Sequence, residues 1–214
     1  MLVKEETALK VAQSLLKIKA IKLNLKSPFT WASGWKSPIY CDNRITLSYP
    51  SIRTYIRQQF VKIIHDEFGD IDVIAGVATG GIAHGALVAQ DLGLPFAYVR
   101  SSAKDHGLSK SIEGVVESGQ SVIVIEDLIS TGDSSLKAVN ALKDAGANVK
   151  GLVAIFTYGF DVADEKFKAA ACPAYALSDY KFLIQQALAD NFVTENDIES
   201  LNNWRKNPSG WPKI

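Results

Sequence analysis

A run of acids, hydroxyl residues and glycine is the part of this sequence best suited to chemistry. It follows the apolar, β-branched segment Ser121–Ile125 and reads Glu126-Asp127-Leu128-Ile129-Ser130-Thr131-Gly132-Asp133-Ser134. Carboxylates at a strand end can accept hydrogen bonds from a pair of ribose hydroxyls. A Ser/Thr/Gly turn lets backbone N–H groups surround a phosphate, and a helix starting there adds the positive end of its dipole. The residues alone also fit a capped helix beside two surface acids.

A glycine pair marks a second loop, Ala78-Thr79-Gly80-Gly81, between the apolar run Ile71–Val77 and the helical segment Ile82–Leu92. Glycine lets the backbone approach a ligand closely, and a helix start offers free N–H groups. Thr79 and Gly80 are therefore candidates for ligand binding, although a Gly pair also simply makes turns. The spacing of neither loop fits a Walker or dinucleotide motif.

Cations gather in a third segment, after the short apolar run Phe96–Val99, which reads Arg100-Ser101-Ser102-Ala103-Lys104-Asp105-His106-Gly107. It has no clear periodicity, so we expect a mobile surface loop over residues 101–113. Because it follows a strand, its cations are candidates for gripping phosphate. They are Arg100, Lys104 and His106.

The fourth segment, Lys26 to Arg44, places aromatic residues beside Gly and Lys. Such a composition forms either a flat slot for an anionic ring or a hydrophobic flap. Its Ser33-Gly34-Trp35-Lys36 string also matches the Ser-x-x-Lys pattern of serine acyl-enzymes. The companion SDN and KTG strings are missing, which favours chance for that match.

Together these four segments, in this order, resemble type I phosphoribosyltransferases over about residues 20 to 160. The Arg-x-x-x-Lys-x-His loop and the Lys26–Arg44 segment narrow the resemblance to the orotate phosphoribosyltransferase family. The resemblance implies transfer of a phosphoribosyl group from phosphoribosyl pyrophosphate to orotate. It also implies Mg²⁺ that arrives with the substrate, with no metal cage in the protein, and a homodimer in which the loop reaches the neighbouring site.

The resemblance also assigns roles to residues of this chain. The catalytic residues it implies are Lys104, Arg100 and His106. Those implied to bind phosphoribosyl pyrophosphate are Arg100, Lys104, His106, Glu126, Asp127, Leu128, Ile129, Ser130, Thr131, Gly132, Asp133, Ser134, Thr79 and Gly80. Those implied to bind orotate are Ser130 and Lys26.

Three departures from the family pattern leave the phosphoribosyl assignment in place and bear on which base is used, and one of them removes a cation near the pyrophosphate. Ser101 stands where many members have Lys, and Glu126 where some have Asp. Phe156-Thr157-Tyr158-Gly159 replaces an Arg that holds orotate in some branches. A phosphoribosyltransferase for another base therefore stays an alternative. So does a non-catalytic regulator that binds phosphoribosyl pyrophosphate, although no strongly basic face or helix-turn-helix is evident.

The elements that must position these loops alternate between apolar runs and helical patterns from Pro50 to Phe156. Runs that are apolar on both faces indicate a covered parallel sheet. We therefore expect an α/β fold with an open, mainly parallel sheet flanked by helices, and ligands beyond the carboxyl ends of the strands. The chain reads as a single domain over 1–214, with a hood at about 1–48 and a core at about 49–214. The Lys26–Arg44 part of the hood reads as short strands and turns.

Composition fits a folded cytoplasmic protein. The 214 residues are 47% hydrophobic with zero formal net charge, so no global field favours nucleic acid or an anionic membrane. The N-terminus reads as an amphipathic helix, not a signal peptide, and no stretch is long enough to span a membrane. Cys41 and Cys172 are far apart, which indicates neither a disulfide framework nor a zinc site. His65 and His84 suggest no further site.

Overall fold

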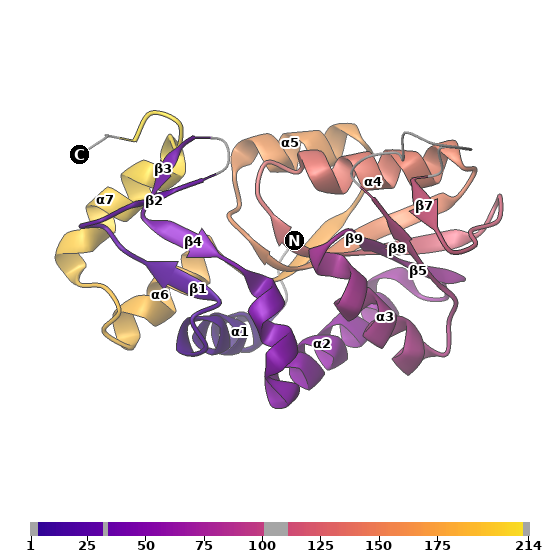
Figure 1. Cartoon of the computed structure of the whole chain (residues 1–214), viewed down its shortest axis with the longest axis horizontal. Helices are drawn as coiled ribbons and strands as arrows, with labels where there is room; N and C mark the ends of the chain where they lie inside the picture. Colours follow the sequence, from indigo (N-terminus) through magenta and orange to yellow (C-terminus); the bar gives the residue numbers. More distant parts are fainter. Residues whose placement is uncertain (1–3, 32–33, 101–110, 212–214) are drawn as a thin grey trace.

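The computed structural model describes residues 4–31, 34–100 and 111–211, and within these ranges its centre is a six-stranded sheet (Figure 1). The strand order is β10-β9-β8-β5-β6-β7, and only β7 runs antiparallel to its neighbour. Their bounds are β5 Val73–Val77, β6 Phe96–Val99, β7 Ile112–Glu113, β8 Ser121–Ile129, β9 Asn148–Thr157 and β10 Ala174–Asp179. The predicted α/β fold with an open, mainly parallel sheet is confirmed.

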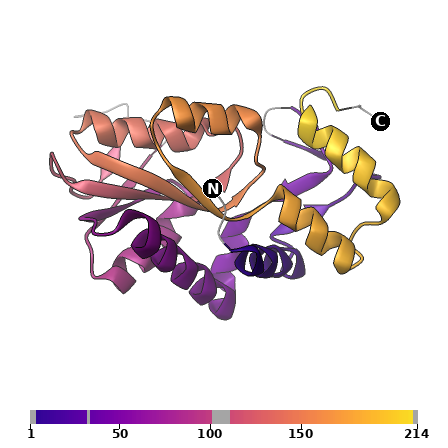
Figure 2. The same cartoon turned by 180° about the vertical axis from the view of Figure 1, so that it is seen from behind.

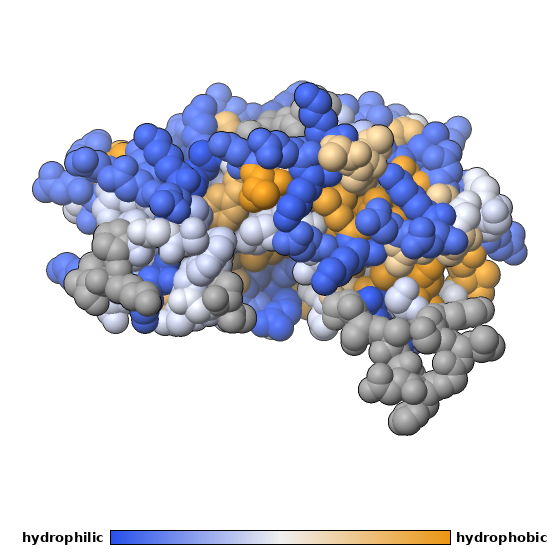
Figure 3. All heavy atoms as spheres, turned by 90° about the horizontal axis from the view of Figure 1, so that it is seen from above, coloured by the Kyte–Doolittle hydropathy of each residue, from blue (hydrophilic) through white to orange (hydrophobic). Residues whose placement is uncertain are grey.

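Helices cover both faces of this sheet (Figures 1 and 2). On one face lie α1 (Glu5–Lys17), α2 (Pro50–Phe68) and α3 (Gly80–Leu92). On the other lie α4 (Asp133–Asp144) and α5 (Asp161–Ala169), whose outer surface is largely hydrophilic with apolar patches between (Figure 3). All five residues of β5 are buried because they are covered from both sides. None of the helices in the described ranges is both long and apolar enough to cross a membrane.

The N-terminal segment adds short antiparallel ladders at one end of the molecule, β1 with β4 and β2 with β3. Their bounds are β1 Ile21–Leu23, β2 Phe29–Thr30, β3 Lys36–Ser37 and β4 Ile39–Cys41, followed by the 3₁₀ helix η1, Asn43–Ser48. The prediction of short strands and turns between Lys26 and Arg44 is thus confirmed.

The C-terminal helices α6 (Tyr180–Ala189) and α7 (Glu195–Lys206) lie beside these ladders (Figures 1 and 2). The reason is an aromatic cluster around Trp204, which is fully buried. Its ring lies 5.7 Å from Trp31 and 5.8 Å from both Tyr158 and Phe160, centroid to centroid. One side layer is therefore built from both ends of the chain.

Two details of the sheet differ from the sequence expectation. The strand expected over Ser121–Ile125 continues to Ile129, because β8 stays paired with β9 up to Ile129 opposite Thr157. Glu126 and Asp127 thus lie within β8. Because they are charged, the sequence pattern predicted that the strand ended before them. The end of the expected loop over 101–113 forms β7, which pairs with Tyr98 and Val99 of β6.

Candidate active site

The loops singled out from the sequence meet at the carboxyl edge of the sheet. Strands β5, β6, β8 and β9 are parallel neighbours, so their following segments emerge on the same side. Those segments carry Thr79 and Gly80, Arg100, Ser130 to Ser134, and Tyr158 with Gly159. The sheet topology thus brings together residues that are far apart in the chain.

The two acids of β8 lie in different environments. Glu126 is 4% exposed, and its Oε2 accepts a 2.9 Å hydrogen bond from Ser135 Oγ. Its Oε1 accepts another, also 2.9 Å, from the backbone N–H of Asp127. Burial and then the neighbouring charge of Asp127 raise the pKa of Glu126 well above its ordinary value. Asp127 is only partly buried and is the more accessible carboxylate of the pair.

Glycines let the loop after β5 pack directly on these acids. A Cβ built on Gly80 would lie 2.2 to 2.4 Å from the carboxylate atoms of Asp127. A Cβ on Gly81 would lie 2.3 Å from the carbonyl oxygen of Ile125. Thr79 is exposed, and the Ala78–Thr79 peptide bond is cis. The backbone of this loop and the Asp127 carboxylate therefore border the same space.

The segment after β8 turns sharply into α4. Gly132 adopts a left-handed conformation with φ of +81°, and α4 starts at Asp133. The Asp133 carboxylate accepts hydrogen bonds from Lys166 Nζ at 2.6 Å and Thr131 Oγ1 at 2.8 Å, which lower the pKa of Asp133. That side chain is turned toward α5, so the free N–H groups at the helix start are what this segment offers an anion.

Other predicted residues of this segment take different positions. Ser130 and Thr131 are half-buried, and Ser134 is exposed. Leu128 and Ile129 belong to β8, and Ile129 is buried among the core residues on the α4 side. Leu128 packs against the other core cluster. Both apolar side chains are therefore part of the core.

Arg100 follows the last residue of β6 and contacts residues at the other end of the predicted loop. Its Nε is 3.3 Å from Glu113 Oε1, and its backbone N–H donates to the Ser111 carbonyl at 2.8 Å. The two ends of the loop over 101–113 are thus held together. Lys104 and His106 lie outside the described residues.

Lys26, predicted to bind orotate, belongs to the N-terminal segment. It is exposed in the segment between β1 and β2. Its charge acts on Asp197 of α7, whose pKa is lowered by hydrogen bonds from Thr194 and to a smaller extent by Lys26.

An arginine that the sequence analysis gave no role reaches the loop after β9. Arg205 of α7 donates from Nη2 to the Gly159 carbonyl and from Nε to the Tyr158 carbonyl, the latter at 3.3 Å. In the sequence, Arg205 stands in the C-terminal string Trp204-Arg205-Lys206-Asn207-Pro208. The spacing of these residues gives no indication that Arg205 contacts the loop after β9.

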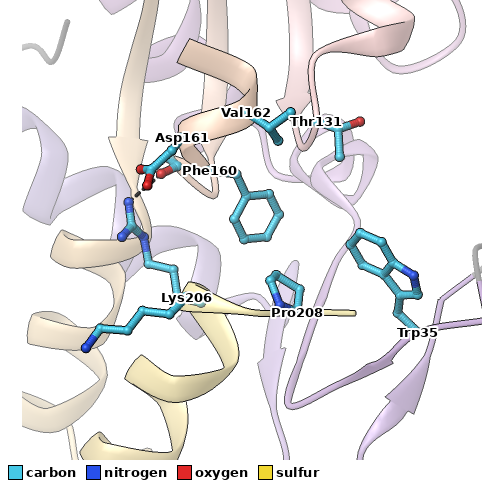
Figure 4. A pocket seen from close by; sticks show the side chains of 9 residues that line it. Trp35, Thr131, Phe160, Asp161, Val162, Lys206 and Pro208 are labelled. Atoms are coloured by element: carbon cyan, nitrogen blue, oxygen red, sulfur yellow. Dashed lines mark hydrogen bonds between the residues drawn. The ribbon is translucent and has the colours of Figure 1, made fainter. Parts of the chain in front are cut away.

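Beside Arg205 lies a cavity of about 260 Å³. It lies between the N-terminal layer, which is the part of the chain that forms β1 to β4, the phosphate turn, which is the turn from Ser130 to Ser134 named for its predicted role, and α7. Trp35, Phe160 and Pro208 face it from three different segments, and Thr131 stands at its rim (Figure 4). Arg205 and Gly159, which are joined by a hydrogen bond, also line the cavity. The cavity adjoins the Ser130–Ser134 turn.

The remaining titratable groups supply no metal cage within the described ranges, where no cluster of three or more His, Cys, Asp or Glu side chains has metal-binding geometry. His65 is exposed on α2 and His84 is buried in α3. Cys41 and Cys172 are free thiols.

The fold and the site define the class of protein. The family model described as phosphoribosyl transferase domain matches residues 50–189, which include the sheet from β5 to β10 and the loops after β5 and β8. The protein is a phosphoribosyltransferase, and the predicted enzyme class is confirmed.

Comparison with individual proteins narrows the class. The chain is 56% identical to orotate phosphoribosyltransferase of Bacteroides thetaiotaomicron over 94% of both chains. It is 53% identical to the Staphylococcus saprophyticus enzyme of the same name, over 93% of this chain and 98% of that one. The crystal structure of orotate phosphoribosyltransferase from Aeropyrum pernix superposes with a TM-score of 0.73 and 27% identity, covering 82% of this chain and 97% of that one. The chain belongs to the orotate phosphoribosyltransferase family.

Proposed function

We propose that this protein transfers the 5-phosphoribosyl group from phosphoribosyl pyrophosphate to orotate. The products are orotidine 5′-phosphate and pyrophosphate, in the synthesis of pyrimidine nucleotides. The observation that carries the proposal is the direct packing of Gly80 against the Asp127 carboxylate. This packing puts the Thr79–Gly80 backbone and the Asp127 carboxylate around one space near the start of α4, which supports Asp127 as the acid that binds the sugar.

In the proposed complex each loop contacts one part of phosphoribosyl pyrophosphate. Asp127 is the accessible acceptor for the ribose hydroxyls, and the buried Glu126 beside it holds the Asp127 N–H. The Ser130–Ser134 turn and the start of α4 hold the 5-phosphate through backbone N–H groups and hydroxyls. The Thr79–Gly80 loop and Arg100 face the pyrophosphate.

The difficult step is the departure of pyrophosphate from the anomeric carbon, through an oxocarbenium-like state comparable to that of glycoside hydrolysis. The ring nitrogen of orotate needs no strong base once that carbon is electrophilic. Catalysis then rests on positioning and on stabilising the negative charge that develops on pyrophosphate. Arg100, Lys104 and His106 supply this stabilisation, and closure of the loop over 101–113 excludes water.

Mg²⁺ is proposed to enter with the substrate. The described acids at this edge fit that role, because a single accessible carboxylate, Asp127, faces the ligand space while Glu126 is committed to Ser135 and to the Asp127 N–H. Oxygen donors suit Mg²⁺, which keeps several non-protein ligands. When bound to the pyrophosphate oxygens, the ion would neutralise part of their charge.

Orotate is proposed to bind between the Ser130 side of the phosphate turn and the N-terminal layer. Ser130 is half-buried next to Thr131, which lines the cavity. The role of Lys26 stays a prediction, because its ammonium lies near Asp197. A homodimer with shared sites and a cytoplasmic location are likewise proposed, the latter supported by the two free thiols.

The test is the loss of orotate's ultraviolet absorbance after addition of phosphoribosyl pyrophosphate, with and without Mg²⁺. We expect metal-dependent loss that excess pyrophosphate reverses. An unchanged absorbance together with thermal stabilisation by phosphoribosyl pyrophosphate would contradict orotate as the acceptor. The same sugar site would then serve another base or a regulatory role.

A further inference from the structure

Asn43 joins the N-terminal layer to the sugar-binding acids. It is fully buried at the start of η1, and its Nδ2 donates a 2.6 Å hydrogen bond to the backbone carbonyl of Asp127. Its Oδ1 accepts from Cys41 Sγ at 3.3 Å. Both ends of the amide are therefore used, and its orientation is fixed because only the NH₂ end can donate to a carbonyl.

The bond satisfies a main-chain group that the sheet leaves open on the β5 side. The ladder between β5 and β8 ends where Gly76 pairs with Ile125. Asp127 lies beyond that point, and a partly buried carbonyl without a partner would be costly. The Asn43 side chain takes the place that a neighbouring strand would otherwise fill.

Asn43 is itself held from α3. Thr46 Oγ1 donates to the Asn43 carbonyl at 2.5 Å and lies 2.9 Å from His84 Nε2. The single hydroxyl proton goes to the carbonyl, so His84 Nε2 is the donor to Thr46. Thr46 and His84 are both fully buried, and burial lowers the pKa of His84 to about 4, which keeps its ring neutral.

This network reaches two ligand loops at once. Helix α3, which carries His84, begins at Gly80, and Gly80 packs on the Asp127 carboxylate. The same Asp127 is held through its carbonyl by Asn43. A shift of the η1 segment would therefore move the acid relative to the glycine loop.

We propose that Asn43 is a positioning residue for the phosphoribosyl group, acting through the main chain of Asp127. This inference rests on the proposed function, in which Asp127 binds the ribose hydroxyls. Asn43 does not touch substrate; it fixes the acid that does. Its loss should therefore weaken the binding of phosphoribosyl pyrophosphate more than that of orotate.

The experiment compares Asn43→Ala and Asn43→Asp with a matched control, Ser178→Ala. Ser178 is also fully buried, and its hydroxyl donates to the Ala8 carbonyl at 2.8 Å, between β10 and α1. All three variants remove one buried hydrogen bond to a main-chain carbonyl. We measure kcat, the KM for each substrate, the Kd for phosphoribosyl pyrophosphate alone, and Tm.

For Asn43→Ala we expect the KM and Kd for phosphoribosyl pyrophosphate to rise about tenfold, with a smaller change in the KM for orotate. Asn43→Asp should be worse, because it places a second negative charge beside Asp127. Ser178→Ala should lower Tm without this selective change. Unaltered binding of phosphoribosyl pyrophosphate in the Asn43 variants, or the same rise in Ser178→Ala, would overturn the inference.

Thr46→Val carries the test if the Asn43 variants do not fold. It keeps Asn43 but removes the hydroxyl that holds it, so a smaller rise in the same Kd is expected; no rise would refute the inference. Failure of orotate turnover in the unaltered protein would count against the proposed acceptor only. The Kd comparison would still decide the role of Asn43.

Discussion

Adjacent residues in one strand serve different purposes at this site. Glu126 is buried and accepts hydrogen bonds on both oxygens, whereas Asp127 is accessible and contacts the glycine loop. Alternation along β8 produces this difference, because successive side chains point to opposite faces of a strand. Glu126 holds the main chain of Asp127, and Asp127 is the acid that we propose to bind the ribose.

The packing of Gly80 against the Asp127 carboxylate leads to the first prediction, for Gly80→Ala. The added methyl group has no room beside the Asp127 carboxylate, so the loop or the acid must move. We expect kcat/KM for phosphoribosyl pyrophosphate to fall about a hundredfold, as a displacement near 1 Å can cause.

The control for this prediction is Gly85→Ala in the same helix, where a Cβ would lie 2.7 Å from the Phe96 ring instead. It should lower Tm without a comparable loss of kcat/KM. If kcat/KM fell equally in both variants, the loss in Gly80→Ala would come from a disturbed α3 and not from the contact with Asp127.

Lys104→Ala is the second prediction at the residue scale. Lys104 is proposed to stabilise charge on the departing pyrophosphate, and removal of one such group lowers kcat by about a hundredfold or more. Tm should stay unchanged, because the sequence predicts a surface loop over residues 101–113. The measurement is steady-state kinetics of Lys104→Ala and of the control Lys110→Ala, which removes another cation of the same predicted loop. Near-normal turnover of Lys104→Ala would remove it from the catalytic residues.

At the scale of elements, α7 acts on the site although it follows the family-matched region. It starts after residue 189, where the match to the phosphoribosyl transferase domain ends. Trp204 anchors it in the aromatic cluster, and Arg205 then reaches the carbonyls of Tyr158 and Gly159. Because the Tyr158 N–H donates to the Ile129 carbonyl, the loop after β9 and the phosphate turn are joined.

Arg205→Met tests this connection. It keeps most of the side-chain length but removes the charged donors, which should lower the free energy of unfolding by about 1 to 3 kcal/mol. The KM for orotate should rise several-fold, and Arg205→Lys should recover part of both losses. The matched control is Lys206→Met, an exposed neighbour for which we expect a change within about 0.5 kcal/mol. Urea unfolding measures the free energy of unfolding of each variant, and steady-state kinetics measures the KM for orotate. Equal changes in Arg205→Met and Lys206→Met would exclude a specific role for Arg205.

At the scale of the whole molecule, the proposed dimer predicts complementation between two inactive variants. If the loop over 101–113 completes the partner's site, a hybrid of Lys104→Ala and Asp127→Asn protomers has one site with both changes and one with neither. Random mixing should then restore about a quarter of normal activity. Each variant alone supplies the baseline. Activity that stays at this baseline in a mixture shown to contain hybrids would place the loop in its own protomer's site.

Overall stability should depend on pH through His84. Its pKa is about 4 when folded and 6.5 ordinarily, so the unfolded chain takes up a proton first as pH falls. The stabilising contribution is full above about pH 6.5 and is lost progressively as pH falls toward 4. At about pH 5 the loss should be about 2 kcal/mol.

Urea unfolding at about pH 7 and about pH 5 measures this loss. His84→Gln should remove the His84 part of the pH dependence, whereas His65→Gln, at a histidine whose side chain is 87% exposed, should not. The same pH dependence in His84→Gln as in the unaltered protein would show that other groups are responsible.

The sequence by itself determined the alternation of strands and helices, and hence which loops share the carboxyl edge. Apolar periodicity specifies each element locally, and parallel order follows from the connecting helices. It also specified the acid pair and the phosphate turn, because their chemistry depends on adjacent residues. The true end of β8 was missed, since pairing with β9 outweighs the charge of Glu126 and Asp127.

Only the tertiary structure decided the contacts between residues remote in the chain. Asn43 and Asp127 are 84 positions apart, and Arg205 is 46 positions from Gly159. No local pattern encodes such pairs, because they depend on how the two ends of the chain pack around Trp204 and on where the ladder between β5 and β8 stops. Local residue types thus specified the chemistry of the site, and long-range packing decided which side chains hold it in place.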